Sequence, residues 1–298
     1  MNWIANEDTI IFNTEYNEEL DIELISRYKK IIFSDYELNN KLFEFYENGI
    51  FHSFGNLKFI GSKFNKDISN LPLNITHLIL GNDFIRDVSK LPQTLTHLTF
   101  GINFNQDVSV LPHTLTHLTF NDYFNQDVSK LPQGITHLTF GFNFNQDASN
   151  LPQGITHLTF HDNFNQDVSK LPQGITHLTF GYYFNKDVSN LPQGITHLTF
   201  GYCFNKDVSK LSPFLTHLIL DGDFNQDISN LPSSLTHLSL GRNFNQQCVI
   251  HPNIKYLKLD FNNQYLIDSL PNSITELELD FYFNCRQNYD IYVRNVLA

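Results

Sequence analysis

The sequence contains little cysteine, little positive charge and no long apolar run. Its 298 residues include 3 cysteines and 1 methionine, and 19 Lys and Arg residues stand against 31 Asp and Glu residues. Cys203, Cys248 and Cys285 are odd in number and lack CxxC spacing, which argues against a disulfide framework and against a zinc site. No segment approaches the roughly 20 apolar residues of a membrane-spanning helix. These absences favour a reducing compartment and a chain that does not enter a membrane.

The acidic balance also bears on partners. A formal net charge of -12 repels phosphate backbones and anionic lipid headgroups. The N-terminal stretch MNWIANEDTIIF lacks the basic region and apolar run of a secretory signal peptide. We therefore expect no nucleic-acid partner, no membrane association and a cytoplasmic location.

What the sequence does contain is a repeat. The tripeptide Thr-His-Leu recurs every 20 residues without a slip, and the unit reads ITHLTFGFNFNQDASNLPQG over residues 135–154. A fixed period of this length is typical of solenoid proteins. The histidines at position 3 of the unit are His77, His97, His117, His137, His157, His177, His197, His217 and His237.

Weaker copies flank these nine units, so we expect about fourteen coils. Downstream copies contain Ile254, Leu257 and Leu259, and then Ile274, Leu277, Leu279, Phe283 and Asn284. Upstream copies contain Ile10, Phe12, Tyr16 and Asn17, then Ile31, Phe33, Leu38 and Asn39, and then Leu57, Phe59, Phe64 and Asn65. This reading divides the chain into an N-terminal cap with degenerate coils (residues 1–54), a repeat solenoid (55–285) and a C-terminal cap (286–298).

The apolar positions predict the fold of one coil. Leu138 and Phe140 alternate with His137, Thr139 and Gly141, which is the period of a short strand with one buried face. The proline at position 18 and the short return segment disfavour a helix on the other side. We therefore predict a leucine-rich-repeat-like β-solenoid with one parallel sheet and a helix-poor convex side.

Three further columns should hold the coils together. The phenylalanine at position 10 should form a buried stack from coil to coil. The asparagine at position 11 should bond the backbone of a neighbouring coil, although Ile85 interrupts that column. Aspartate at position 13 and serine at position 15 should brace a turn by side-chain to backbone hydrogen bonds.

The unit L-P-x-x-(I/L)-T-H-L-T-F-G-x-x-F-N-Q resembles the FNIP repeat, a relative of the leucine-rich repeat found in social amoebae and in large viruses that infect amoebae. The resemblance extends over about residues 55–285 and rests on many near-identical copies. Members of this family are mostly uncharacterised. We expect a non-catalytic protein-binding scaffold that uses its strand face and variable turn edge, located in the cytoplasm or the host-cell cytoplasm. The F-box and kinase domains that accompany some such repeats are not evident here.

The histidine ladder has two readings. On an exposed strand face the rings would lie about 4.8 Å apart, so that two could share a transition-metal ion, but a closed site needs three or four ligands. The plainer reading is a packing ladder beside the threonines, with no metal and no cofactor. Acidification should charge neighbouring imidazoles together and destabilise the sheet.

Catalysis has little support. Serine, histidine and aspartate all recur, but a catalytic triad needs one orienting environment rather than nine equivalent ones. Some parallel β-helix proteins act on polysaccharides, so a carbohydrate-active enzyme stays as an alternative. We expect the chain not to be an enzyme.

Positions 7 to 9 of the unit differ between coils and are better candidates for function. Their apolar members form a candidate partner-binding patch: Ile102, Tyr123, Phe142, Tyr182, Tyr183 and Tyr202. Aromatic residues inside a polar rim are typical of protein-binding hot spots, while drift on exposed loops is the simpler explanation. The alternative class is a structural protein that assembles with copies of itself, and the oligomeric state stays open.

Overall fold

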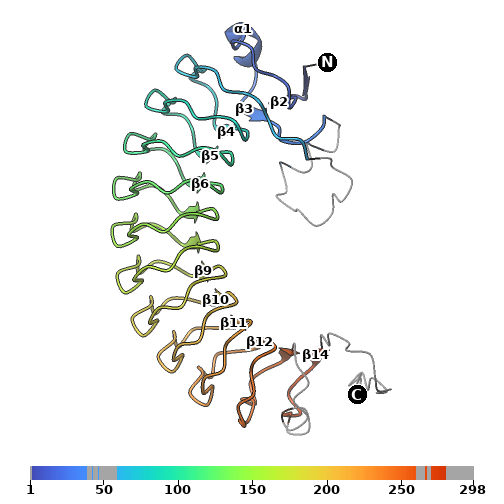
Figure 1. The fold of residues 1–298 in the computed structure, drawn as a ribbon, viewed down its shortest axis with the longest axis vertical. Helices are drawn as coiled ribbons and strands as arrows, with labels where there is room; N and C mark the ends of the chain where they lie inside the picture. Colours follow the sequence, from blue (N-terminus) through green and yellow to red (C-terminus); the bar gives the residue numbers. More distant parts are fainter. Residues whose placement is uncertain are drawn as a thin grey trace. The chain divides into compact units, whose positions relative to one another are not determined.

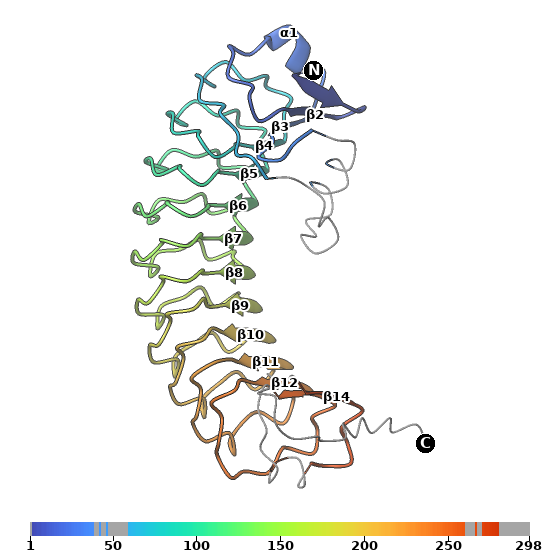
Figure 2. The same ribbon diagram turned by 45° about the vertical axis from the view of Figure 1, so that its right-hand side comes forward.

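The computed structural model describes residues 2–38, 42, 46, 59–259, 266 and 270–279 (Figure 1). The chain divides into two compact units, Met1–Ile155 and Thr156–Ala298. Within each unit, short strands follow one another in chain order, and from residue 77 to residue 254 each strand leads into a turn and an irregular return path (Figure 2). The proposed C-terminal cap, residues 286–298, lies outside the described residues, as do Phe283, Asn284 and Cys285.

The first unit begins with a hairpin, and its later strands are parallel. Strand β1 pairs antiparallel with β2, whereas β2, β3 and each following strand pair in parallel with strictly corresponding residues opposite each other. The elements are β1 (Trp3–Ala5), β2 (Thr9–Phe12), α1 (Ile22–Ile25), β3 (Lys30–Phe33), β4 (His77–Ile79), β5 (His97–Thr99), β6 (His117–Thr119) and β7 (His137–Thr139).

The second unit repeats this arrangement with parallel strands throughout. Neighbouring strands again pair His to His and Leu to Leu until the histidine is replaced by tyrosine and then by glutamate. Its strands are β8 (His157–Thr159), β9 (His177–Thr179), β10 (His197–Phe200), β11 (His217–Leu220), β12 (His237–Leu240), β13 (Tyr256–Leu259) and β14 (Glu276–Leu279).

Each coil closes around the side chains that the repeat predicted to be buried. In residues 135–154 the inward positions are exposed by 2% or less, and they are Ile135, Leu138, Phe140, Phe144, Ala148 and Leu151. Burying a side chain of this size stabilises the fold by roughly 1.5 to 3 kcal/mol. The described residues 60–259 contain no helix. The predicted β-solenoid with a helix-poor return side is therefore confirmed.

Phenylalanine rings form the centre of the coils. Phe120 at position 6 stacks on Phe124 at position 10 of the same coil, with ring centroids 3.7 Å apart. Phe124 and Phe144, at position 10 of successive coils, lie 6.2 Å apart and nearly parallel. The expected column is present, and its shortest contacts run within a coil rather than between coils.

The return path satisfies its backbone with the repeated polar side chains. The Asn125 side chain accepts the backbone N–H of Asn145 in the next coil at 2.9 Å. Asp127 accepts both the backbone N–H and the hydroxyl of Ser129, at 2.9 and 2.8 Å. The backbone N–H of Ile135 donates to the carbonyl of Pro132, which closes a turn before the next strand. The asparagine and aspartate columns thus have the bracing roles predicted for them.

The structure corrects the assignment of the upstream coils. Phe33 stacks on Phe64 at 3.7 Å, the same contact that Phe100 makes with Phe104 at 3.8 Å. Phe33 and Phe64 are 31 positions apart in the chain, whereas Phe100 and Phe104 are 4 positions apart. Phe33 and Phe64 therefore belong to one coil, which carries 27 additional residues between its position 6 and its position 10.

The pairing of strands leads to the same conclusion. Lys30 in β3 lies directly opposite His77 in β4, so no further strand of the sheet lies between them. Phe59, expected to be buried, is 53% exposed, and its backbone forms an isolated bridge with Tyr36 rather than part of a strand. The interpretation of two separate coils, one with Leu38 and one with Phe59, is therefore wrong, and Asn39 and Leu57 lie outside the described residues.

No helix in the described part of the chain is long and apolar enough to cross a membrane.

Candidate functional site

The histidines form a stacked ladder on the strands of each unit. In the first unit the rings of His77, His97, His117 and His137 follow at centroid distances of 4.0, 4.1 and 4.2 Å. In the second unit the distances between successive rings from β8 to β12 are 4.2, 4.2, 4.1 and 4.0 Å. The rings are half-buried rather than exposed as the strand pattern predicted, because each ring covers its neighbour.

The threonine before each of the nine histidines fixes the orientation of its ring. The hydroxyl oxygen of Thr96 lies 2.9 Å from Nδ1 of His97 and 3.2 Å from the carbonyl oxygen of Thr76 in the preceding coil. The same carbonyl accepts the backbone N–H groups of Thr96 and His97. The threonine at position 2 therefore links the imidazole to the sheet, which explains why Thr precedes His in the repeat.

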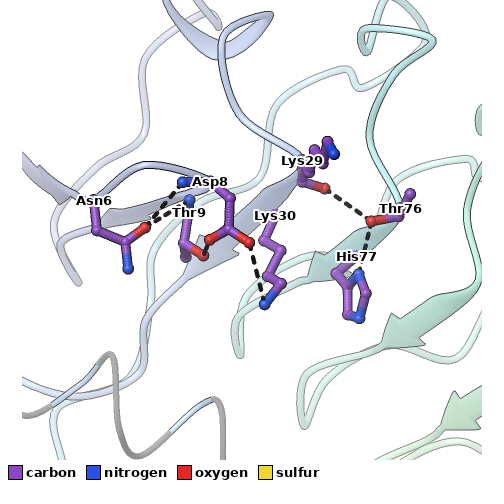
Figure 3. A network of polar contacts seen from close by, with 7 residues as sticks. All are labelled: Asn6, Asp8, Thr9, Lys29, Lys30, Thr76 and His77. Carbon is purple, nitrogen blue, oxygen red and sulfur yellow. Dashed lines mark hydrogen bonds and ion pairs between the residues drawn. The ribbon is translucent and has the colours of Figure 1, made fainter.

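Charged and aromatic groups stand at the ends of the ladders. In the first unit Lys30 occupies the place next to His77 and pairs with Asp8 at 3.4 Å (Figure 3). In the second unit the ring of Tyr256 follows His237 at 5.7 Å. The hydroxyl of Tyr256 donates to Glu278 at 2.6 Å, so this end of the ladder lies beside a carboxylate.

Burial and neighbouring cationic groups lower the pKa values of four histidines of the ladders. Burial, followed by the neighbouring histidines, lowers the pKa of His97 to about 4. The pKa values of His77, His197 and His217 are also lowered, first by burial and then by nearby cationic groups. These imidazoles take up a proton less readily than they would in an unfolded chain.

The described residues contain no group of three or more His, Cys, Asp or Glu side chains that could hold a metal ion. The aspartates and serines of the repeat bind each other on the return path, as Asp207 binds Ser209 through both its oxygens. These hydrogen bonds lower the pKa of Asp207. In the described coils the structure thus pairs aspartate with serine and histidine with threonine.

The variable turn edge comprises positions 7 to 9, the residues directly after each strand. Position 7 varies less freely than the sequence suggests, because a Cβ atom at Gly141 would lie 2.2 Å from the carbonyl carbon of Asn121 in the preceding coil. Positions 8 and 9 carry residues other than glycine in every one of these coils except the one with Gly222, and they include the candidate partner-binding residues.

In the first unit the candidate residues do not form a ring cluster. Tyr123 and Phe142 are 54% and 44% exposed, and Ile102 is half-buried. The backbone N–H of Tyr123 donates to the carbonyl of Ile102, which places these two residues side by side. Among the described residues, neither Tyr123 nor Phe142 has a ring contact.

In the second unit the structure brings all three candidates together. The rings of Tyr182 and Tyr202 stack with centroids 4.9 Å apart and planes 4° from parallel. Tyr183 meets Tyr182 edge-on at 4.8 Å. Tyr182 and Tyr183 nevertheless remain 41% and 50% exposed. We call these three residues the tyrosine cluster.

Arg242 completes the tyrosine cluster from two coils away. Its guanidinium lies over the ring of Tyr202 at 4.9 Å and donates a hydrogen bond to the Tyr202 hydroxyl. Gly222, in the coil between, has a φ of 49°, and a Cβ atom there would lie 2.6 Å from the Tyr202 ring. Arg242 is not among the partner-binding residues predicted from the sequence, although the glycine at position 8 of one coil alone was a visible signal.

Carboxylates border the tyrosine cluster. Asp162 accepts the backbone N–H of Tyr182 at 3.3 Å. Asp223 accepts the side-chain amide of Asn243 at 2.9 Å. Partial burial and then the charge of Asp223 raise the pKa of the Cys203 thiol, which places this carboxylate within electrostatic reach of the cluster.

Comparison with known proteins identifies the repeat. The family model described as FNIP Repeat matches eight overlapping segments that together span residues 64–142 and 147–281. Among solved structures, CroV588 from a giant virus, described as a novel circular LRR protein, is similar at 35% identity with a TM-score of 0.78. The match covers 94% of this chain and 41% of that chain, so the present chain spans less than half the length of CroV588. No curated protein matches the chain.

Proposed function

This chain belongs to the FNIP repeat family, and on that basis we propose that it is a non-catalytic scaffold that binds a protein partner through its strand face and its variable turn edge. A solenoid of the leucine-rich-repeat kind is suited to this role, because its coils present a long surface whose variable positions change without disturbing the core. Within that surface we assign the main contact to the tyrosine cluster.

The observation that carries the proposal is the exposure of the tyrosine cluster. Tyr182 and Tyr183 are large, rigid and amphipathic, and they stay about half exposed although the interior of every neighbouring coil is closed. Aromatic side chains of this kind supply most of the binding energy in many protein interfaces. Several other coils carry Asn, Asp or Gly at the same positions, so packing does not require tyrosine here.

The proposed scaffold acts in a reducing compartment, the cytoplasm or the host-cell cytoplasm. Cys203 and Cys248 are free thiols in the structure. Unpaired cysteines of this kind are typical of proteins that are kept reduced.

Affinity capture with the whole chain as bait tests the proposal. The variant Tyr182→Ala/Tyr183→Ala/Tyr202→Ala should lose the captured partner, since truncating hot-spot residues costs about 2 kcal/mol or more each. The matched control replaces three exposed apolar residues of the return path, Val110→Ala/Phe214→Ala/Val249→Ala, and should capture the partner normally. Undiminished capture by the tyrosine variant, with a melting curve like that of the native chain, contradicts the proposed function.

A second candidate function is self-assembly into a structural array, and one observation favours it. A solved chain that is similar to this one, and more than twice as long, is described as circular. Sedimentation over a wide concentration range separates the two candidates. A chain that sediments as a monomer at every concentration supports the scaffold that binds a different protein. Larger species that increase with concentration support self-assembly.

A further inference from the structure

Between residues 157 and 243 of the second unit, the net charge is concentrated on one surface. From residue 157 to residue 243, the return path carries four aspartates and four lysines, and the strand positions carry uncharged threonines and half-buried histidines. The turn edge carries three aspartates and a single arginine. The negative charge of this segment therefore lies beside the tyrosine cluster, at Asp162, Asp221 and Asp223.

The chain already recognises a guanidinium at this surface. Arg242 lies over the face of Tyr202 and donates to its hydroxyl, which is the geometry of a cation–π contact reinforced by a hydrogen bond. This hydrogen bond also raises the pKa of Arg242. The internal contact uses one tyrosine of the cluster and leaves Tyr182 and Tyr183 with large exposed areas.

Asp162 and Asp223 make the exposed tyrosines a surface for a second cation. Asp162 is held against the backbone of Tyr182, and Asp223 lies on the far side of Tyr202, held by Asn243. A cation that stacks on a tyrosine face next to a carboxylate is attracted both by the quadrupole of the ring and by the negative charge of the carboxylate. An acidic or phosphorylated partner would instead meet carboxylates of the same sign.

We propose that the tyrosine cluster, together with Asp162 and Asp223, binds an arginine-bearing basic segment of the partner protein. This inference rests on the proposed function and adds the chemistry of the partner. One arginine stacks on the exposed tyrosines as Arg242 stacks on Tyr202, and the two aspartates accept hydrogen bonds from guanidinium groups. Arginine fits better than lysine, because its planar fork can stack and donate at the same time.

Fluorescence anisotropy with synthetic peptides tests this directly on the full chain. The probe is a dye-labelled peptide of alternating glycine and arginine, and the matched probe replaces each arginine by citrulline, which has the same shape without the charge. We expect binding of the arginine peptide, weaker binding of a lysine peptide, and none of the citrulline peptide. Equal binding of the arginine and citrulline peptides overturns the proposal.

Protein variants then locate the site. The variant Tyr182→Leu/Tyr183→Leu keeps apolar side chains but removes the aromatic rings. It should lower the affinity for the arginine peptide about tenfold. The control Phe214→Leu likewise replaces an aromatic ring by leucine, at a 66% exposed residue outside the turn edge, and should leave the affinity unchanged. An equal loss in both variants, or no loss in either, overturns the assignment to this surface.

The charge contribution is measured separately. The variant Asp162→Asn/Asp223→Asn should bind the arginine peptide with lower affinity, because two carboxylates no longer attract it. The affinity should also depend less on the salt concentration. An unchanged affinity and salt dependence in this variant contradicts the role of the aspartates.

The outcomes also separate this inference from the proposed function. If the tyrosine triple variant loses a cellular partner while the arginine peptide does not bind, the scaffold function stands and the basic-segment assignment fails. If the sedimentation of the native chain depends on concentration and Tyr182→Leu/Tyr183→Leu abolishes that dependence, the occupant is a second copy of this chain, and the proposal is overturned.

Discussion

The strand side and the turn edge of the coils differ in what repetition does for them. On the strand side, identical residues stack on one another, as His177 does on His197 at 4.2 Å, so each copy packs against its own kind. At the turn edge, position 8 changes from Asp162 to Tyr182 and Tyr202 and then to Gly222, so no ladder of identical residues continues from coil to coil. A position that keeps the same residue from coil to coil is thus fixed by packing, whereas a position that changes from coil to coil lies on surface that is free to bind a partner.

The largest test of this comparison uses two phenylalanines of one coil. Phe144 is fully buried, and Phe142, two residues earlier on the turn edge, is 44% exposed. We expect Phe144→Ala to lower the free energy of unfolding by about 3 to 5 kcal/mol, because it leaves a cavity in the ring stack. Phe142→Ala should change it by about 0.5 kcal/mol or less. Denaturant titration followed by circular dichroism measures both.

Equal destabilisation by Phe142→Ala and Phe144→Ala would contradict the division into a packed interior and a free edge. Phe144→Leu is the control for ring loss without a large cavity, and it should fall between the two alanine variants.

Acid should act on the strand side and spare the turn edge. The pKa of His97 is about 4 in the folded chain and near 6.5 in an unfolded one. A lowered pKa in the folded state means that the stability is fully present above about pH 6.5 and is lost as the pH falls toward about 4. We expect the melting temperature to drop by several degrees between about pH 7.5 and about pH 5.

The variant His97→Gln removes one titrating ring and should reduce the slope of stability against pH in that window. Tyr182→Leu/Tyr183→Leu should retain the native slope, because it changes the turn edge only. A melting temperature that stays constant down to about pH 5 would show that the ladder does not resist protonation.

Gly222→Ala should disturb the turn edge through the backbone. Its φ of 49° lies in the left-handed region, and the new Cβ atom would meet the carbonyl oxygen of Tyr202 at 2.4 Å. We expect a loss of about 1 to 3 kcal/mol in unfolding free energy, together with weaker binding of the arginine peptide, since Tyr202 must move. Gly154→Ala, where the nearest atom would be an ordinary 3.4 Å away, serves as the control.

Ile85→Asn should give the smallest effect and the opposite sign. Asn65 accepts the backbone N–H of Ile85, but Ile85 has no side-chain oxygen to offer Asn105 in the next coil. Restoring asparagine should stabilise the first unit by about 0.5 to 1 kcal/mol. Asn125→Ala, which withdraws the acceptor from the N–H of Asn145, should destabilise it by a similar or larger amount. A loss of stability in Ile85→Asn would contradict the role of the column.

Sequence reasoning succeeded where the spacing is constant and failed where it is not. The buried set Ile135 to Leu151 follows from the 20-residue period, because every coil repeats the same local environment. The coil that contains Phe33 and Phe64 broke this assumption with its additional residues, and nearby Leu38 and Phe59 offered a closer but false match. The stacking of Phe33 on Phe64 and the pairing of Lys30 with His77 show which residues belong to the same coil.

The candidate site shows the same division. Position in the repeat identified Tyr182, Tyr183 and Tyr202 as free surface, and their proximity in the second unit followed from adjacent coils. The position of Arg242 over Tyr202 depends on a contact that skips one coil and requires a glycine between. The 20-residue period does not predict which side chains extend across two coils to contact each other.

The sequence by itself determined the structure of the coil. A hydrophobic pattern with a 20-residue period and a fixed proline buries its apolar side chains when each repeat forms one short strand and an irregular return path. It also determined which positions are free to vary. Tertiary structure alone decided which residues share a coil near the N-terminus, that the histidine rings cover one another, and that a guanidinium rests on Tyr202. These features depend on strand register and on distances between coils, which the chain specifies only once it is folded.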